Sequence, residues 1–314
     1  MIIKTLVHIP LYNKATTIVR TLNSVFDQNY KDFDILIIND GSTDESLELV
    51  KNINHHRIII HSQENKGVSA TRNNAILFAR ENNYKRIAFL DGDDFWCSNH
   101  LSTLCALFDK FPEAHIAATN YQLKRSRKTI DTVLSNFEST EDQLLKSFFH
   151  HNYLNSIFTC STLMIKPEIV DKTGLFNESL THFEDIDWFV RIGMKSKIAF
   201  SFRVTAVIDE IADNRSDQVE MKYRKLPDFT DYEAEAKNHL GLEKYIDLNR
   251  FAIALAYRME NDIRNTTLYQ QKINLKNLSL KQQQLLKMSS LQLKSLKRTQ
   301  KVLGNLGLHL RAGD

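Results

Sequence analysis

Glycine and proline are scarce in this sequence, with 9 and 4 residues among 314. That scarcity excludes collagen-like chains and Pro/Gly-rich disordered chains, and it favours long helices and strands. Long hydrophobic runs are absent as well, because the longest, residues 251–257, is much shorter than the ~18 residues of a membrane-spanning helix. Hydrophobic residues still make up 42% of the chain, which is enough for a globular core.

Cysteine is rare too, since Cys97, Cys105 and Cys160 are the only three and show no C-x-x-C spacing. An odd number without paired spacing argues against a disulfide framework and indicates a reducing compartment. The N-terminal residues run directly into a strand pattern and lack the charged-then-apolar layout of a signal peptide. We therefore expect a soluble, cytoplasmic protein.

Two nucleotide-binding signatures are missing. No G-x-G-x-x-G follows the first expected strand, and G-x-x-x-x-G-K-[ST] occurs nowhere in the chain. The first pattern binds the pyrophosphate of dinucleotides, and the second holds the phosphates in P-loop NTPases. Their absence argues against a dinucleotide-dependent oxidoreductase and against a P-loop NTPase.

Charge is distributed unevenly along the chain. Residues 272–314 contain nine lysines and arginines and one acidic residue, a net +8, whereas the whole chain carries +3. Leucines recur in this tail at roughly heptad spacing, namely Leu286, Leu293, Leu296 and Leu303. Two interpretations stay open: an amphipathic helix on an anionic membrane, or leucines that pack on the body or in a homodimer. A basic tail on a mildly acidic body does not favour nucleic-acid binding by the whole protein.

The first 120 residues alternate between strand and helix periodicity. The expected strands are residues 3–9, 34–38, 57–61, 87–90 and 114–120, and the helices are 17–26, 69–81, 99–111 and one that ends near 53 after the capping residues 42–44. Strands that alternate with helices at this spacing predict βαβ units, a parallel sheet and the α/β class. Ligands of such sheets bind at the carboxyl ends of the strands.

The second half has fewer regular elements at first. Residues 121–158 are polar and irregular, and their basic patch 124–128 is expected to be a solvated loop. A strand is expected over 160–165 and a helix over 184–195. After about residue 216 the chain reads as nearly all helix, which divides it into an α/β domain at 1–215 and a helical C-terminal region at 216–314.

Three carboxylates stand within four residues directly after the fourth strand, at Asp91, Asp93 and Asp94. Like charges this close are unfavourable unless a cation lies between them. Carboxylate oxygens at a strand end suit Mg²⁺ or Mn²⁺ that bridges to a phosphate, so Asp93 and Asp91 are the candidate metal ligands. The alternative is an acidic turn that caps a helix.

Three other strand ends carry polar segments before this D-G-D pattern (a D-X-D motif). They are Pro10-Leu11-Tyr12-Asn13, Asn39-Asp40-Gly41-Ser42-Thr43-Asp44 and the stretch from Asn65 to Asn73. In this order the four segments resemble the inverting glycosyltransferases of family 2, which have the GT-A fold. The resemblance covers about residues 3–200 and implies a nucleotide-diphosphate-sugar donor, expected to be a UDP-sugar, across the carboxyl ends of the strands.

The resemblance also implies roles for single residues. Pro10 and Tyr12 would line the base and ribose pocket, and Asp40 would accept the N3–H of a uracil-like base. Arg72 would approach the base or the diphosphate, and Asp91 would hold the ribose or a metal-bound water. The complete set of expected substrate-binding residues is Pro10, Tyr12, Asn13, Asp40, Asn65, Gly67, Arg72 and Asp91.

An acidic pair precedes the helix over 184–195. Inverting transfer needs a base that takes the proton of the acceptor hydroxyl, and a carboxylate at a helix start is suited to this. The family has an E-D pair here, and Glu184-Asp185 matches it, so Asp185 is the expected base and Glu184 its support. Asp187 is expected to pair with Arg191 at i, i+4. The alternative is an acidic cluster that the helix dipole favours.

One departure from the family pattern concerns the third metal ligand. Many members carry an R-x-H-type segment after the base, whereas residues 207–216 contain no histidine here. Substitutes in that stretch would be Asp209, Glu210, Asp213 or Arg215, or a water molecule. His182 is expected to be structural or to face the acceptor.

We therefore expect a GT-A domain with a helical C-terminal region that transfers a sugar with inversion and with Mn²⁺ or Mg²⁺. The resemblance most often implies surface-polysaccharide or lipid-linked glycan synthesis, with a glycan or lipid-linked acceptor and contact with the inner face of the membrane through residues 272–314. Two alternatives stay open: a nucleotidyltransferase, and a catalytically silent nucleotide-sugar-binding subunit of a synthase. The intact D-G-D and E-D segments argue against the silent subunit.

Overall fold

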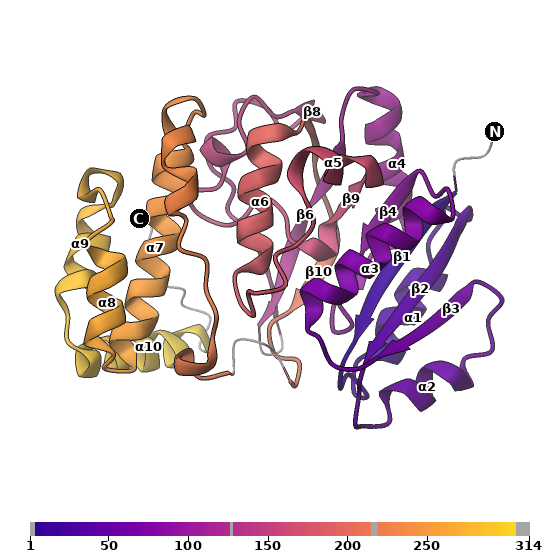
Figure 1. Ribbon diagram of the computed structural model, residues 1–314, viewed down its shortest axis with the longest axis horizontal. Coiled ribbons are helices and arrows are strands. Elements are labelled where there is room, and N and C mark those ends of the chain that lie inside the picture. The colour runs from indigo at the N-terminus through magenta and orange to yellow at the C-terminus, as the bar shows by residue number, and fades with distance from the viewer. Residues whose placement is uncertain (1–3, 126–127, 215–218, 306–314) are drawn as a thin grey trace.

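The computed structural model describes residues 4–125, 128–214 and 219–305, with side chains described as far as residue 299. A mixed sheet lies between layers of helices, and a group of C-terminal helices stands at one end of it (Figure 1). The strands are β1 (Thr5–Leu11), β2 (Phe33–Asp40), β3 (Ile58–Gln63), β4 (Arg86–Phe89), β5 (Phe95–Trp96), β6 (Ile116–Arg125), β7 (Lys128–Asp131), β8 (Gln143–Leu144), β9 (Leu163–Ile165) and β10 (Ile198–Asp209). The α-helices are α1 (Ile18–Phe26), α2 (Ser46–Asn52), α3 (Val68–Glu81), α4 (His100–Lys110), α5 (Val170–Thr173), α6 (Glu184–Lys195), α7 (Leu242–Met259), α8 (Ile263–Gln270), α9 (Leu280–Lys287) and α10 (Ser290–Asn305).

The strand order is β3-β2-β1-β4-β9-β6-β10-β5, with β7 paired to β6 and β8 paired to β10. The strands β1 to β4 are mutually parallel, and so are β6 and β10. The short β9 runs antiparallel to both of its neighbours, β4 and β6. The expected α/β class is confirmed, and the five strands expected in the first 120 residues run in the same direction, with the antiparallel β9 inserted between β4 and β6.

Both faces of the parallel half are covered, which explains the continuous apolar runs in its inner strands. Successive residues of β1 point to opposite faces, so Leu6 lies in one hydrophobic cluster and Val7 in the other. The first cluster contains Ala75 and Ile76 of α3, and the second contains helix residues such as Leu22 of α1. The expected helices at 17–26 and 69–81 are therefore the two layers that sandwich this sheet.

Pro10 lies inside β1, although the sequence predicted that the strand ends there. In a parallel strand, residues two apart direct their backbone groups to the same neighbour. His8 bonds to β4 through its carbonyl, which accepts from the N–H of Leu90, so Pro10 faces the same side. The β4 strand has ended at Phe89 by that level, and the missing N–H of Pro10 therefore breaks no ladder hydrogen bond.

The longest strand, β10, was not expected from the sequence. It is parallel to β6 but has register shifts between Ser201 and Val204 and between Val204 and Ala206. These irregularities interrupt the alternation of apolar and polar residues that identifies a strand. The apolar runs before and after the shifts, 198–200 and 206–208, are the only signal that the sequence offers.

The basic patch is not a solvated loop over its described residues. Lys124 and Arg125 end β6, and Lys128 begins β7, which returns as a hairpin. Lys124 Nζ lies 2.8 Å from a carboxylate oxygen of Asp209, and Arg125 pairs with Glu210. The ion pairs with the end of β10 give this patch its structure, while residues 126–127 lie outside the described part of the chain.

The C-terminal helices share a hydrophobic core with the sheet-bearing part of the chain. Tyr245 of α7 lies against Phe148 and Phe149, with ring centroids 5.6 and 5.5 Å apart, and these residues belong to the same cluster as Leu6 of β1. The boundary near residue 215 stays a prediction, since the cluster continues across it.

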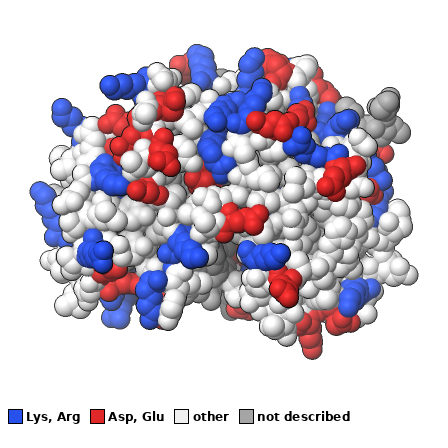
Figure 2. All heavy atoms as spheres, viewed as in Figure 1, with Lys and Arg blue, Asp and Glu red and all other residues white. Residues whose placement is uncertain are grey.

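Two of the heptad-spaced leucines of the basic tail pack inward. Leu286 of α9 and Leu293 of α10 are buried, and both helices lie beside α7 (Figure 1). In the face that Figure 2 shows, basic side chains are interspersed with acidic ones. No helix among the described residues is long and apolar enough to cross a membrane. Membrane docking by residues 272–314 stays a prediction, and Leu303 has no described side chain.

Leu286→Ala tests this packing. Because the side chain is 2% exposed and belongs to the main core, we expect its truncation to lower the free energy of unfolding by about 2–5 kcal/mol. Leu291→Ala is the matched control, since Leu291 lies on α10 and is 80% exposed, and its effect should stay within about 0.5 kcal/mol. Urea denaturation measures both, and equal effects would contradict the packing of α9 on α7.

Candidate active site

Polar loops after β1, β2, β3 and β4 meet at one edge of the sheet, as the parallel order requires. Asn13, which has a positive φ of 51°, ties the first two loops together. Its side-chain oxygen accepts from the N–H of Thr43 at 2.8 Å, and its own N–H donates to Ser42 Oγ at 3.2 Å. Tyr12 beside it is 40% exposed, so its ring is available to a ligand.

Asp40, at the end of β2, holds the loop after β3. One carboxylate oxygen accepts from the N–H of Lys66 and from Gln63 Nε2, and the other accepts from the N–H of Gly67, each at 2.8 Å. Gly67 has a φ of +87° immediately before α3, and Asn65 lies exposed at the rim. The second oxygen keeps one lone pair for a further donor, and base recognition by Asp40 stays a prediction.

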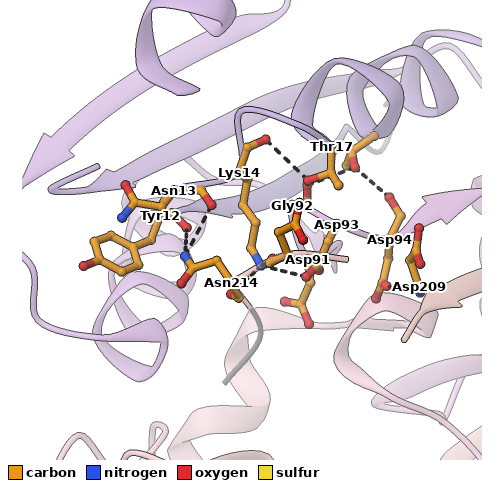
Figure 3. A network of polar contacts seen from close by, with 12 residues as sticks. Tyr12, Asn13, Lys14, Thr17, Asp91, Gly92, Asp93, Asp94, Asp209 and Asn214 are labelled. Carbon is orange, nitrogen blue, oxygen red and sulfur yellow. Dashed lines mark hydrogen bonds and ion pairs between the residues drawn. The ribbon is translucent and has the colours of Figure 1, made fainter. Parts of the chain in front are cut away.

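The D-G-D loop is fixed by three side chains at the start of α1, of which Figure 3 labels Thr17. Thr17 Oγ1 donates to the carbonyl of Gly92 at 2.8 Å, and Thr21 Oγ1 donates to the carbonyl of Asp94 at 2.7 Å. Arg20 Nη2 donates to the carbonyl of Asp93 at 2.6 Å. The i, i+3, i+4 spacing of these three residues was a sequence signal for this contact.

The three carboxylates of this loop have three different environments. Asp91 lies 2.9 Å from Arg72 Nη2, and Asp93 lies 2.7 Å from Lys14 Nζ. Asp94 is buried and accepts from Ser161 Oγ at 2.5 Å and from the N–H of Asp209 at 2.9 Å. Burial, then Asp93 and Asp91, raise the pKa of Asp94 well above its ordinary value. Side-chain cations thus pair with Asp91 and Asp93, and the expected Mg²⁺ or Mn²⁺ stays a prediction.

Arg72 connects the two halves of the site. Its guanidinium is buried, with Nη2 on Asp91 and Nη1 3.1 Å from an oxygen of Glu184, and it lies over the ring of Phe176. His8 lies beneath the same loop, and burial lowers its pKa to about 3, so a neutral ring adds no charge beside Arg72. Sequence reasoning did not identify His8.

The acidic pair begins α6 after Phe183, which has a left-handed φ of 59°. Asp185 is half-buried and accepts from the N–H of Ile186 at 2.8 Å. Asp187 accepts from Arg191 Nη2 at 2.7 Å, which confirms the expected i, i+4 pair.

A further contact reaches the same helix from the C-terminal region, since Tyr232 Oη donates to Asp187 at 2.6 Å. His182 is buried just before the helix, and its Nδ1 lies 3.0 Å from Thr181 Oγ1, which favours a structural role.

The donor set at the D-G-D loop fits a hard divalent cation only with help from a substrate. Among the described residues, no three His, Cys, Asp or Glu side chains come together as a metal site. The Asp93 carboxylate nevertheless lies 2.7 Å from the ammonium group of Lys14, which shows that it faces a position that a cation can take. Mg²⁺ commonly uses one or two carboxylates together with phosphates and waters, so Asp93 and Asp91 suffice for the protein's share.

The substitutes for a third ligand mostly have other partners. Asp209 pairs with Arg20 at 2.8 Å and with Lys124, and Glu210 pairs with Arg125. The backbone carbonyl of Asp213 lies 3.5 Å from Lys14 Nζ. Arg215 lies outside the described residues.

Comparison with known proteins agrees with this architecture. The family model described as "Glycosyl transferase family 2" matches residues 6–172, more than half of the chain. The chain is 30% identical over 202 residues to the Escherichia coli UDP-Glc:alpha-D-GlcNAc-diphosphoundecaprenol beta-1,3-glucosyltransferase WfaP, a match over 64% of this chain and 73% of WfaP. It is 28% identical over 192 residues to the Escherichia coli chondroitin synthase, which covers 59% of this chain but 26% of that enzyme.

A solved structure shows the same fold. It is S. aureus TarS residues 1–349 in complex with UDP-GlcNAc, with a TM-score of 0.59 and 17% identity, over 86% of this chain and 70% of that one. The GT-A fold and the order of the loops at its strand ends therefore agree with the matched sequence family. The chain belongs to glycosyl transferase family 2 and is a glycosyltransferase.

Proposed function

We propose that this glycosyltransferase moves a sugar from a UDP-sugar to a glycan or a lipid-linked glycan, with inversion at the anomeric carbon. The observation that carries the proposal is the buried Arg72 guanidinium, which joins Asp91 of the D-G-D loop to Glu184 of the E-D pair. A donor diphosphate at the first carboxylate and an acceptor hydroxyl near the second would then lie on the two sides of one side chain.

The donor side favours a uridine nucleotide. The free lone pair of Asp40 suits the N3–H of uracil, and the exposed ring of Tyr12 suits stacking on the base. WfaP, the relative with 30% identity, is named for a UDP-Glc donor. Pro10 and Asn13 would line the same pocket from the end of β1, and Asn65 and Gly67 would line it from the loop after β3.

The acceptor class follows from the relatives. WfaP is named for an acceptor on diphosphoundecaprenol, and the chondroitin synthase is named for a polysaccharide. These names support our proposal that this chain acts in surface-polysaccharide or lipid-linked glycan synthesis. The nucleotidyltransferase alternative has no support from the matched family.

Asp185 is the proposed general base. The acceptor oxygen attacks the anomeric carbon from the face opposite the diphosphate, the acceptor proton passes to the Asp185 carboxylate, and the bond between the anomeric carbon and the diphosphate oxygen breaks to release UDP. Burial raises the pKa of Asp185, although Arg72 lowers it. A carboxylate with a raised pKa is a stronger base, and such a base contributes about 10²- to 10⁴-fold to the rate.

Asp93, with Asp91, would hold a Mn²⁺ or Mg²⁺ ion. Such an ion would supply charge stabilisation for the leaving diphosphate. Arg72 would add a permanent positive charge on the same side, since a guanidinium does not lose its proton in proteins. Glu184 in turn would keep this guanidinium in place between the donor and Asp185.

The nucleotide is tested by thermal shift with UDP, GDP, CDP and dTDP, with and without Mn²⁺. We expect UDP with Mn²⁺ to raise the melting temperature most, because a ligand at 100 times its Kd stabilises the fold by about 2.7 kcal/mol. Asp93→Ala should abolish the Mn²⁺-dependent part of the shift. A larger shift with another nucleotide would change the donor, and unchanged Mn²⁺ dependence in Asp93→Ala would refute the metal assignment.

Asp185→Asn separates binding from chemistry. We expect UDP affinity to stay close to that of the wild type while kcat falls at least ~10²-fold, because only the proton acceptor is lost. The matched control is Asp187→Asn on the same helix turn, which loses part of its bonds to Arg191 and Tyr232 and should lower stability without a comparable loss of kcat. Wild-type turnover in Asp185→Asn would move the base to Glu184.

Glu184 gives a pH dependence of stability. Burial and then Asp185 raise its pKa from 4.5 to about 7, although Arg72 lowers it. The unfolded chain loses this proton near pH 4.5 and the folded protein only near pH 7, so this carboxyl lowers the stability as the pH rises between those values. We expect the difference in free energy of unfolding between Glu184→Gln and the wild type to shift in favour of the variant as the pH rises from 5 to 8. Urea denaturation at the two pH values measures this shift.

The contributions of the other titrating groups cancel in the difference between the variant and the wild type. His8 and His100, whose pKa values burial lowers to about 3, act with the opposite sign but are present in both proteins. Glu48→Gln, at an exposed glutamate of α2, should show the same difference from the wild type at both pH values. A pH-independent effect of Glu184→Gln would contradict the raised pKa.

A further inference from the structure

Lys14 occupies the position at Asp93 that a metal would take. Its Nζ lies 2.7 Å from Asp93 Oδ2, 3.0 Å from the carbonyl oxygen of Asn214 and 3.5 Å from that of Asp213 (Figure 3). One carboxylate and two carbonyl oxygens thus converge on one cation. These are also the oxygen ligands that hard divalent ions prefer.

This ion pair is part of a built site. The lysine and aspartate side chains are only 14% and 10% exposed. The lysine stem crosses Gly92, where a Cβ atom would lie 3.2 Å from Lys14 Cγ and 3.1 Å from the carbonyl oxygen of Pro10. A glycine between the two aspartates therefore makes room for the stem.

The backbone of Lys14 is fixed on both sides. Its N–H donates to Ser46 Oγ at 2.6 Å, and its carbonyl accepts from the N–H groups of Thr17 and Ile18 at 3.0 and 2.9 Å. Thr17 also holds the carbonyl of Gly92, so one residue fixes the lysine relative to the D-G-D loop. The side chain beyond Cγ is a flexible stem that can redirect its ammonium group while its backbone stays in place.

The cation that lies beside Asp93 changes the net charge around the D-G-D loop. Arg72 and Lys14 pair with Asp91 and Asp93 when no ligand is bound, and Arg72 also pairs with Glu184. A divalent ion alone would add two positive charges to this largely buried place, and the diphosphate of a nucleotide sugar alone would add two negative charges. The two together add no net charge, so each should favour the binding of the other.

We propose that Lys14 is a competitor for the metal position on Asp93 and leaves it when a nucleotide diphosphate offers a new anionic partner. The divalent ion then enters only with the nucleotide, and Lys14 sets the strength of this coupling. The inference rests on the proposed function for the presence of a nucleotide and a metal. Lys14 is a positioning residue in this scheme, because it acts through the occupancy of Asp93.

Calorimetric titration of Mn²⁺ into the full chain, with and without saturating UDP, tests the competition. For the wild type we expect weak Mn²⁺ binding alone and at least ~10-fold tighter binding with UDP, within the usual range of coupling. Lys14→Met should bind Mn²⁺ alone at least ~10-fold more tightly than the wild type and should bind UDP alone more weakly. An Mn²⁺ affinity of Lys14→Met without UDP that equals or falls below that of the wild type would overturn the proposal.

Four further variants serve as controls for this interpretation. Lys14→Gln removes the same charge with a polar side chain and should reproduce the gain, whereas Lys14→Arg keeps the charge and should keep the coupling. Asp93→Asn in the Lys14→Met background should remove the gained Mn²⁺ binding, which places the ion at Asp93. Lys51→Met, at an exposed lysine of α2, should match the wild type.

The results also separate this proposal from the function. Tighter Mn²⁺ binding by Lys14→Met in a protein that binds no nucleotide would support the competition and refute the UDP-sugar function. Unchanged Mn²⁺ affinity in a protein that binds UDP would refute the competition and leave the function in place.

Discussion

Repulsion among three neighbouring carboxylates is the constraint on which this site depends. Asp91 and Asp93 are each held by a cation from another loop or helix, and Asp94 is buried beside Ser161 with its pKa raised. Each of these three contacts joins the D-G-D loop to a different neighbouring segment. The end of β4 is therefore fastened to the loop after β1, to α3 and to the segment before β9, and these are the elements that would surround a nucleotide diphosphate.

Arg72 transmits this constraint to the acidic pair at the start of α6. A buried guanidinium needs acceptors at its N–H groups, and loss of these partners would leave its charge uncompensated, which is costly. Asp91 and Glu184 supply those partners from opposite halves of the site. The D-G-D loop and the start of α6 thus hold each other in place. The distance between this loop and the proposed base is therefore fixed in the absence of ligands.

The C-terminal region contributes to the same helix. Trp188 and Phe189 of α6 are fully buried in the cluster that also contains Tyr245 and Leu286. Tyr232, from the segment before α7, donates to Asp187 one turn from the acidic pair. The segments after β10 therefore hold α6, which begins with the acidic pair, and add to the stability of the fold.

The sequence by itself determined the apolar strands, the helices on both faces, the α/β class and the positions of the four polar loops. These follow from local periodicity, and α6 begins and ends where the pattern over 184–195 placed it. It also determined the Asp187–Arg191 pair, because side chains four positions apart on one helix lie next to each other. The strand β10 escaped detection because two register shifts interrupt its alternation.

Only the tertiary structure decided which cations meet which acids. Lys14 and Asp93 are 79 positions apart, and Arg72 and Glu184 are 112 apart, so no spacing rule connects them. The antiparallel β9 and the inward-facing leucines of the tail were decided in the same way. In each case several partners satisfy the local pattern equally well, and the choice depends on which segments the folded sheet and helices bring within a few ångströms of each other.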